Sequence, residues 1–96
     1  MPACNVSLQV IPLVKENEVY PVVDQVIEFI AASGVKYTVG PMETTMEGEL
    51  DQLLEIVKQA QEICKEAGAE RILSVIKIDY STGGVTIDEK VGKYKV

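Results

Sequence analysis

Histidine and tryptophan are absent from this chain, and its longest apolar runs are short. Histidine is the commonest general base and transition-metal ligand of proteins, so we expect no metal site, and any catalysis would have to use carboxylates, tyrosine, lysine or cysteine. A transmembrane helix needs about 20 apolar residues, so we expect no membrane-spanning segment. The first residues also lack the basic start and apolar stretch of a signal peptide, which predicts a cytoplasmic protein.

Basic residues are also few. Nine lysines and arginines face 15 aspartates and glutamates, which gives a formal net charge of −6. Nucleic-acid binding draws most of its affinity from basic residues that neutralise phosphates. The lysines are scattered and form no basic stripe, so we exclude nucleic acid as a partner.

The two cysteines, Cys4 and Cys64, fall in a predicted strand and a predicted helix. Their separation does not match a metal-ligand motif, so we expect both to be buried or half-buried thiols. Hydrophobic residues make up 47% of the 96 positions and charged residues 25%, a globular balance without a linker or a composition shift. Residues 1–96 therefore form a single predicted domain.

Hydrophobic periodicity predicts six main elements. Val6, Leu8 and Val10 alternate with polar residues as in a half-buried strand, whereas later apolar residues recur at helical spacing. The predicted order is a strand over 5–11, a helix from 19 that a glycine at 34 ends, a hairpin of 35–39 and 43–47, a helix over 50–67, and a strand over 71–80. Residues 88–94 can add a brief helix.

This order is the βαββαβ pattern of ferredoxin-like folds, an α+β sandwich with a four-stranded antiparallel sheet and two helices on one face. The other sheet face would be left open. The alternation predicts that face to carry polar and apolar side chains together: Ser7, Gln9, Ile11, Leu73, Val75, Lys77 and Asp79. Large exposed apolar patches are unusual on monomers, so we expect a homo-oligomer.

The hairpin over 37–48 is the stretch most typical of a binding site. Its second strand is loaded with hydroxyls and a carboxylate, and side chains of a strand alternate between faces. Thr45 and Glu47 therefore project one way, and Thr44 and Met46 project the other way. One face of this strand is polar where a purely structural strand would more often be apolar.

Three segments together carry a family resemblance: Val-Ser-Leu-Gln-Val at 6–10, Tyr-Thr-Val-Gly-Pro-Met-Glu-Thr-Thr-Met-Glu-Gly-Glu at 37–49, and Ile-Asp-Tyr at 78–80 with Gly-Gly-Val-Thr-Ile-Asp-Glu-Lys at 83–90. Over nearly its whole length the chain resembles the small stand-alone thiamine-binding proteins, single-domain relatives of the YkoF-like binders of thiamine and hydroxymethylpyrimidine. The resemblance implies a ferredoxin-like protomer, assembly into homodimers or homotetramers, and a ligand held near a subunit interface. It implies neither catalysis nor a cofactor.

Thiamine or its hydroxymethylpyrimidine half is the ligand that this resemblance suggests. An aminopyrimidine offers an amine and ring nitrogens to a carboxylate and hydroxyls, and a thiazolium cation favours an acidic or aromatic site. The chain lacks the arginine cluster or glycine-rich helix start typical of a pyrophosphate site, so we expect unphosphorylated thiamine. The candidate ligand-binding residues are Ser7, Tyr37, Gly40, Met42, Thr44, Thr45 and Glu47.

Several of these residues also have structural interpretations. Glu47 could stabilise the positive N-terminus of the second helix, Thr44 and Thr45 are common strand residues, and Tyr37 and Met42 could simply pack. Two other functional classes stay open. One is a ferredoxin-like oligomeric enzyme with Glu47 or Tyr37 as acid or base. The other is a regulatory module whose open sheet face binds another protein.

Overall fold

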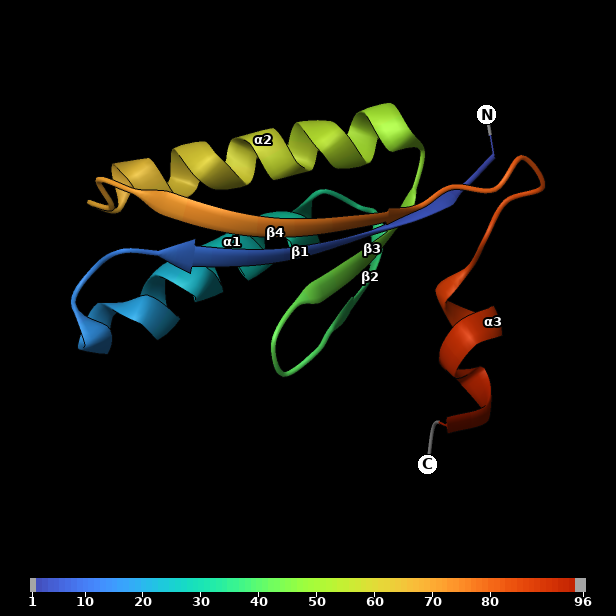
Figure 1. The fold of residues 1–96 in the computed structure, drawn as a ribbon, viewed down its shortest axis with the longest axis horizontal. Helices are drawn as coiled ribbons and strands as arrows, with labels where there is room; N and C mark the ends of the chain where they lie inside the picture. Colours follow the sequence, from blue (N-terminus) through green and yellow to red (C-terminus); the bar gives the residue numbers. More distant parts are fainter. Residues whose placement is uncertain (1, 95–96) are drawn as a thin grey trace.

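The computed structural model describes residues 2–94. Figure 1 shows a sheet with two long helices on one side and a short helix standing apart from them. In chain order the elements are β1 (Cys4–Pro12), a 3-10 turn (Glu16–Glu18), α1 (Val19–Ala32), β2 (Lys36–Val39), β3 (Thr44–Gly48), α2 (Leu50–Glu66), β4 (Ile72–Asp79), α3 (Ile87–Val91) and a final 3-10 turn (Gly92–Tyr94). The predicted elements are confirmed, with boundaries shifted by one or two residues.

The four strands form one antiparallel sheet in the order β2-β3-β1-β4. Both βαβ units cross over on the same side, so α1 and α2 cover one face, as the ferredoxin-like prediction requires (Figure 1). Within residues 2–94, no helix is long and apolar enough to cross a membrane.

The core lies between the sheet and these two helices. It takes alternate residues of β1, one helical stripe from each helix, and Met46 of β3. Its most buried members include Cys4, Val6, Leu8, Val22, Val26, Ile30, Met46, Leu53, Ala60 and Cys64. The period of two in β1 and the helical period in α1 and α2 therefore identify the buried faces correctly.

The ends of the elements follow local chemistry. Gly34 and Gly68 end α1 and α2 with φ of +86° and +104°, which a residue with a Cβ adopts only with strain. Pro12 is the last residue of β1, where it pairs with Ile72 of β4. A proline there interrupts no following ladder hydrogen bond.

Burial protects both thiols from reaction. Cys4 and Cys64 are fully buried, and burial raises the pKa of each thiol above its ordinary value of 9.0, with the Asp79 charge adding to the effect at Cys4. Because the folded-state pKa is the higher one, each thiol's contribution to stability is complete below pH 9.0 and falls as the pH rises through the raised value.

We therefore expect a thiol reagent at pH 8 to label neither cysteine of the native protein and both in denaturant. Mass spectrometry of the labelled chain measures this directly. Complete labelling of the native protein within seconds would contradict the burial of the two side chains.

Candidate functional site

The open face of the sheet carries two neighbouring rows of polar side chains. The hydroxyl row consists of Thr38, Thr45, Ser7 and Lys77, one from each strand, which the strand registers place side by side. The α3 row consists of Lys36, Glu47, Asn5 and Asp79, aligned in the same way. Residues two apart on a strand share a face, so both rows point away from α1 and α2.

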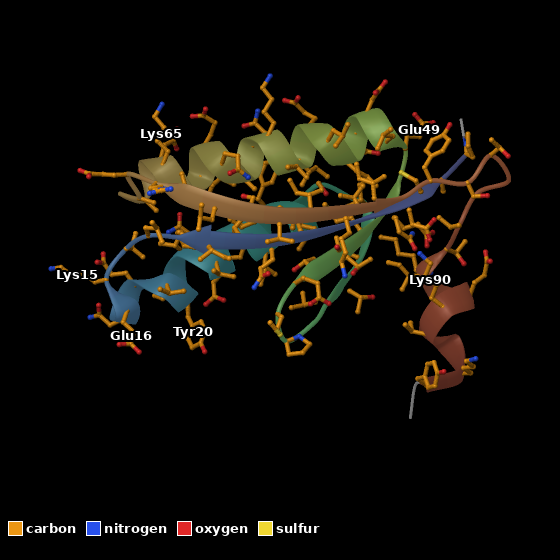
Figure 2. All side chains as sticks on the ribbon, viewed as in Figure 1. Lys15, Glu16, Tyr20, Glu49, Lys65 and Lys90 are labelled. Atoms are coloured by element: carbon orange, nitrogen blue, oxygen red, sulfur yellow. The ribbon has the colours of Figure 1, made fainter. Side chains whose placement is uncertain are left out.

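Helix α3 is fastened to every member of the α3 row. Lys36 Nζ lies 2.6 Å from Asp88 Oδ2, and the backbone N–H of Ile87 donates to Glu47 Oε1 at 2.7 Å. Lys90 Nζ lies 2.6 Å from Asp79 Oδ2 and donates to Asn5 Oδ1 at 2.7 Å. Figure 2 labels Lys90 on the short C-terminal helix, beside the end of the sheet. The last part of the chain is thereby tied across all four strands.

The hydroxyl row, by contrast, lines a cavity of about 520 Å³. A volume of this size suits a small organic ligand. The cavity is lined by Asn5, Ser7, Thr38, Gly40, Glu43, Thr45, Lys77, Ile78, Asp79, Ile87, Lys90 and Val91. Hydroxyls, carboxylates and ammonium groups therefore meet apolar side chains from α3 in one space.

The electrostatics of this region are dominated by paired groups that remain half exposed. The side chains of Lys90 and Asp79 are 43% and 53% exposed, and those of Lys36 and Asp88 are 46% and 57% exposed. The hydrogen bond to Asp88 raises the pKa of the Lys36 ammonium. The contribution of that pair is therefore complete at neutral pH and is lost only as the pH rises through the raised pKa.

Gly40 and Glu43 form the rim of the cavity at the β2–β3 turn. The Gly40 N–H donates to the Glu43 carbonyl at 2.7 Å. A Cβ at position 40 would lie 2.8 Å from Glu43 Oε1 and 3.0 Å from the Glu43 carbonyl oxygen. A Cβ here would displace the flexible Glu43 carboxylate and would make a tight contact with the Glu43 carbonyl oxygen, so a glycine suits this turn.

The seven residues predicted from sequence do not all meet in this cavity. Ser7, Gly40 and Thr45 line it. Thr44 and Tyr37 lie on the opposite side of the sheet, because they pair with Leu8 and Met46 of the helix-facing set. Thr44 is 5% exposed, so its structural interpretation is the one that the burial favours.

Met42 and Glu47 also have different surroundings from those expected. Met42 is 69% exposed in the β2–β3 turn and lies beside an apolar groove against α1. Glu47 is on the predicted face, but its carboxylate accepts the first N–H of α3 and does not line the cavity. The structural interpretation of Glu47 predicts that it stabilises the N-terminus of α2. In the structure its carboxylate instead contacts the N-terminus of α3.

Sequence reasoning missed the contributions of α3 and β4 and two further residues, Asn5 of β1 and Thr38 of β2. Asn5, Thr38, Lys77, Asp79 and Lys90 all line the cavity. Lys77 and Asp79 had been placed on the open face, but only as part of an assembly surface. A usable signal was present, since Thr38 precedes Thr45 at a spacing that places them opposite each other in a four-residue-loop hairpin.

Glu47→Gln tests the connection between β3 and α3. The change keeps the size of the side chain but replaces a charge-assisted hydrogen bond by a neutral one, a loss of about 1 kcal/mol. We expect the Ile87 amide to exchange its hydrogen about fivefold faster, because local opening of α3 becomes that much more populated. Hydrogen exchange followed by nuclear magnetic resonance measures this rate.

Glu49→Gln is the matched control, because Glu49 is exposed and its side chain does not cap α2. That variant should leave exchange in α3 unchanged. Equal exchange rates at Ile87 in the parent protein and in Glu47→Gln would show that Glu47 does not hold α3.

The sequence and the fold both match known proteins. The family model described as "Thiamine-binding protein" matches residues 6–95. The UPF0045 protein of Clostridium perfringens is 64% identical over 95 residues, which covers 99% of this chain and 100% of that protein. Because the aligned region covers 99% of this chain, the similarity to this relative includes the segment that forms α3.

Solved structures agree closely in fold. A DUF77 domain from Bacillus cereus superposes with a TM-score of 0.91 at 54% identity, covering 98% of this chain and 91% of that one. A Thermotoga maritima protein named for a suggested role in thiamine biosynthesis or salvage gives a TM-score of 0.91 at 40% identity, covering 98% and 100%. The resemblance carried by the three sequence segments is thus confirmed, and the chain belongs to the thiamine-binding protein family.

Proposed function

We propose that the chain is a cytoplasmic binding protein for unphosphorylated thiamine or its hydroxymethylpyrimidine half, and that it acts in transport, storage or sensing without catalysing a reaction. The observation that carries this proposal is the cavity over the hydroxyl row in a member of the thiamine-binding family. Three hydroxyls from three strands, Thr38, Thr45 and Ser7, face one space there. Each hydroxyl can donate or accept a hydrogen bond, as an aminopyrimidine requires.

The rest of the cavity suits the other parts of such a ligand. The Glu43 carboxylate can accept a hydrogen bond from an exocyclic amine and attracts a thiazolium cation. Ile78, Ile87 and Val91 supply apolar surface for the ring faces. The single arginine, Arg71, does not line the cavity. Of the two lysines that do, Lys90 is already paired with Asp79, which leaves Lys77 as the cation for a pyrophosphate.

Self-association forms the second part of the proposal. Ile11, Leu73 and Val75 continue the open face beyond the cavity and are 36%, 45% and 51% exposed. An apolar patch beside a polar cavity suits a second copy of the chain, which would complete the pocket in a homodimer or homotetramer. The thiazolium end of the ligand would then lie toward the partner.

The two alternative functional classes gain less support. For an enzyme with Glu47 or Tyr37 as acid or base, neither residue lines the cavity: Glu47 is bonded to α3, and Tyr37 lies on the opposite face of the sheet. A protein-binding role for the open face is limited to the apolar patch of Ile11, Leu73 and Val75, because α3 already covers the α3 row, and we assign that patch to a second copy of the chain.

Calorimetry with thiamine, thiamine diphosphate and hydroxymethylpyrimidine tests the proposal. We expect thiamine or the pyrimidine to bind and the diphosphate to bind no better than thiamine. Mass spectrometry of the ligand after prolonged incubation should recover it unchanged. The proposal is wrong if neither compound binds the folded protein, and its non-catalytic part is wrong if a product accumulates.

A further inference from the structure

The side-chain amide of Asn5 has a fixed orientation. Asn5 is 4% exposed in the middle of the α3 row, and its Oδ1 accepts a hydrogen bond from Lys90 Nζ at 2.7 Å. A lysine ammonium has three donors and no acceptor, so the amide oxygen has to face it. The amide nitrogen is therefore directed away from Lys90.

That nitrogen, Nδ2, has no hydrogen-bond partner among residues 2–94 and is shielded from solvent. Buried polar groups of proteins are almost always hydrogen-bonded, and an orphaned donor opposes folding. Asn5 also lines the cavity over the hydroxyl row. A buried, unpaired donor on a residue that lines a cavity is suited to a ligand that brings an acceptor once the cavity wall has shifted.

We propose that Asn5 determines the specificity of the site: its Nδ2–H₂ donates to an unprotonated ring nitrogen of the bound pyrimidine, and Lys90 is the positioning residue that orients the amide for this contact. The inference rests on the proposed function and adds the ligand atom that the protein reads. A ring with C–H at that position leaves the donor unpaired, and a site built around a polar contact discriminates strongly against such an analogue.

Helix α3 gives the ligand access to this donor. Because Nδ2 is shielded, the cavity wall has to shift before a ligand atom can reach it. Two ion pairs with side chains 43% to 57% exposed fasten α3, and exposed pairs of this kind contribute little to stability. Opening of α3 therefore costs mainly the Ile87–Glu47 and Lys90–Asn5 hydrogen bonds and the burial of Ile87. On closing, Lys90 returns to the oxygen of the amide and the ligand occupies its nitrogen.

The test compares the binding affinities of two proteins for three ligands. Calorimetry compares the parent protein and Asn5→Ala with hydroxymethylpyrimidine and with its two pyridine analogues, each of which has one ring nitrogen replaced by C–H. In the parent, one of the two replacements should weaken binding by roughly five- to 150-fold. In Asn5→Ala the same replacement should lose this penalty, so that only the effects of ligand solvation and basicity remain. Solvation and basicity of the ligand act equally on both proteins and cancel in the ratio.

Lys90 provides a second test that does not disturb the buried residue. Lys90→Met keeps the length of the side chain but removes the donor, so the amide can rotate and present its oxygen to the ligand. We expect the discrimination between ring nitrogen and C–H to fall severalfold. Lys90→Arg, which again has only donors, should restore it. A role for Lys90 in stability alone would change the affinity for all ligands equally and would leave the discrimination intact.

The outcomes separate this inference from the proposed function. Suppose that the parent binds the pyrimidine, and that each replacement of a ring nitrogen lowers the affinity of the parent and of Asn5→Ala by the same factor. The assignment of Asn5 is then overturned and the proposed function stands. If the parent binds neither thiamine nor the pyrimidine, the proposed function falls first. If circular dichroism shows that Asn5→Ala does not fold, the Lys90 variants test the proposal. Unchanged discrimination between ring nitrogen and C–H in Lys90→Met would show that Lys90 does not orient the Asn5 amide.

Discussion

Leu53→Ala is expected to lower the free energy of unfolding by about 2–5 kcal/mol, a large part of the stability of a domain of this size. Leu53 is fully buried on the core side of α2. Its Cδ2 lies within 3.4 Å of the position that a Cβ at Gly48 would occupy, so the side chain closes the end of β3 against the helix. Truncation leaves a cavity that the rigid sheet cannot fill.

Leu54→Ala is the control for this prediction, because Leu54 is the next residue of the same helix and is 39% exposed. The substitution is chemically identical and should cost less than about 1 kcal/mol, since alanine is also the better helix former. Urea denaturation followed by circular dichroism measures both changes. Equal losses of stability in the two variants would contradict the arrangement of α2 on the sheet.

Much of this fold is predictable because hydrophobic periodicity determines which side of each element is buried. Val6 and Leu8 alternate with Ser7, and the observed β1 buries the first pair and leaves Ser7 on the open face. Alternation also places Thr44 and Thr45 on opposite faces of the sheet. The hairpin motif predicts both threonines as candidate site residues, whereas the observed faces bring only Thr45 to the cavity.

The contribution of α3 was not predictable by the same reasoning. Its contacts join residues far apart in the chain: Lys90 reaches Asn5 across 85 positions, and Ile87 reaches Glu47 across 40. Helix α3 has only five residues, too few to be stable alone, so its position depends on these polar contacts and on buried Ile87. Periodicity carries no information on which polar side chains of distant segments will pair.

Register explains why the cavity residues come from all four strands. A hydrophobic pattern indicates the face of a residue but not the residue opposite to it on the next strand. The hydroxyl row exists because Thr38, Thr45 and Ser7 fall in line once the ladders are formed. A one-residue slip of β3 would replace Thr45 in this row by a core residue such as Met46, so the core that fixes the register also builds the site.

Val75→Asp is expected to dissociate the proposed homo-oligomer. Val75 is 51% exposed on the open face, opposite Gln9 and beside Leu73. If this patch is covered by a second copy, the variant places an unpaired carboxylate in an apolar interface, at a cost on the order of several kcal/mol. The dissociation constant should rise more than a hundredfold. Sedimentation velocity over a range of protein concentrations measures the shift.

Val39→Asp is the matched control, because Val39 is 48% exposed in a strand but lies on the helix-facing side, where it pairs with Thr44. It introduces the same charge at the same exposure and should leave the assembly unchanged. An unaltered oligomer in Val75→Asp, or a parent protein that is monomeric at all concentrations, would refute the role of this face.

Assembly and ligand binding should be linked if the second copy completes the pocket. Val75 is two residues from Lys77, so both project from the same face and a partner seated on Val75 would lie at the edge of the cavity. Val75→Asp should then weaken thiamine binding as well, although Val75 does not line the cavity. By the same linkage, saturating thiamine should shift the parent toward the oligomer. Sedimentation of the parent with and without thiamine measures this shift, and an oligomer fraction that does not change would show that each protomer holds its ligand alone.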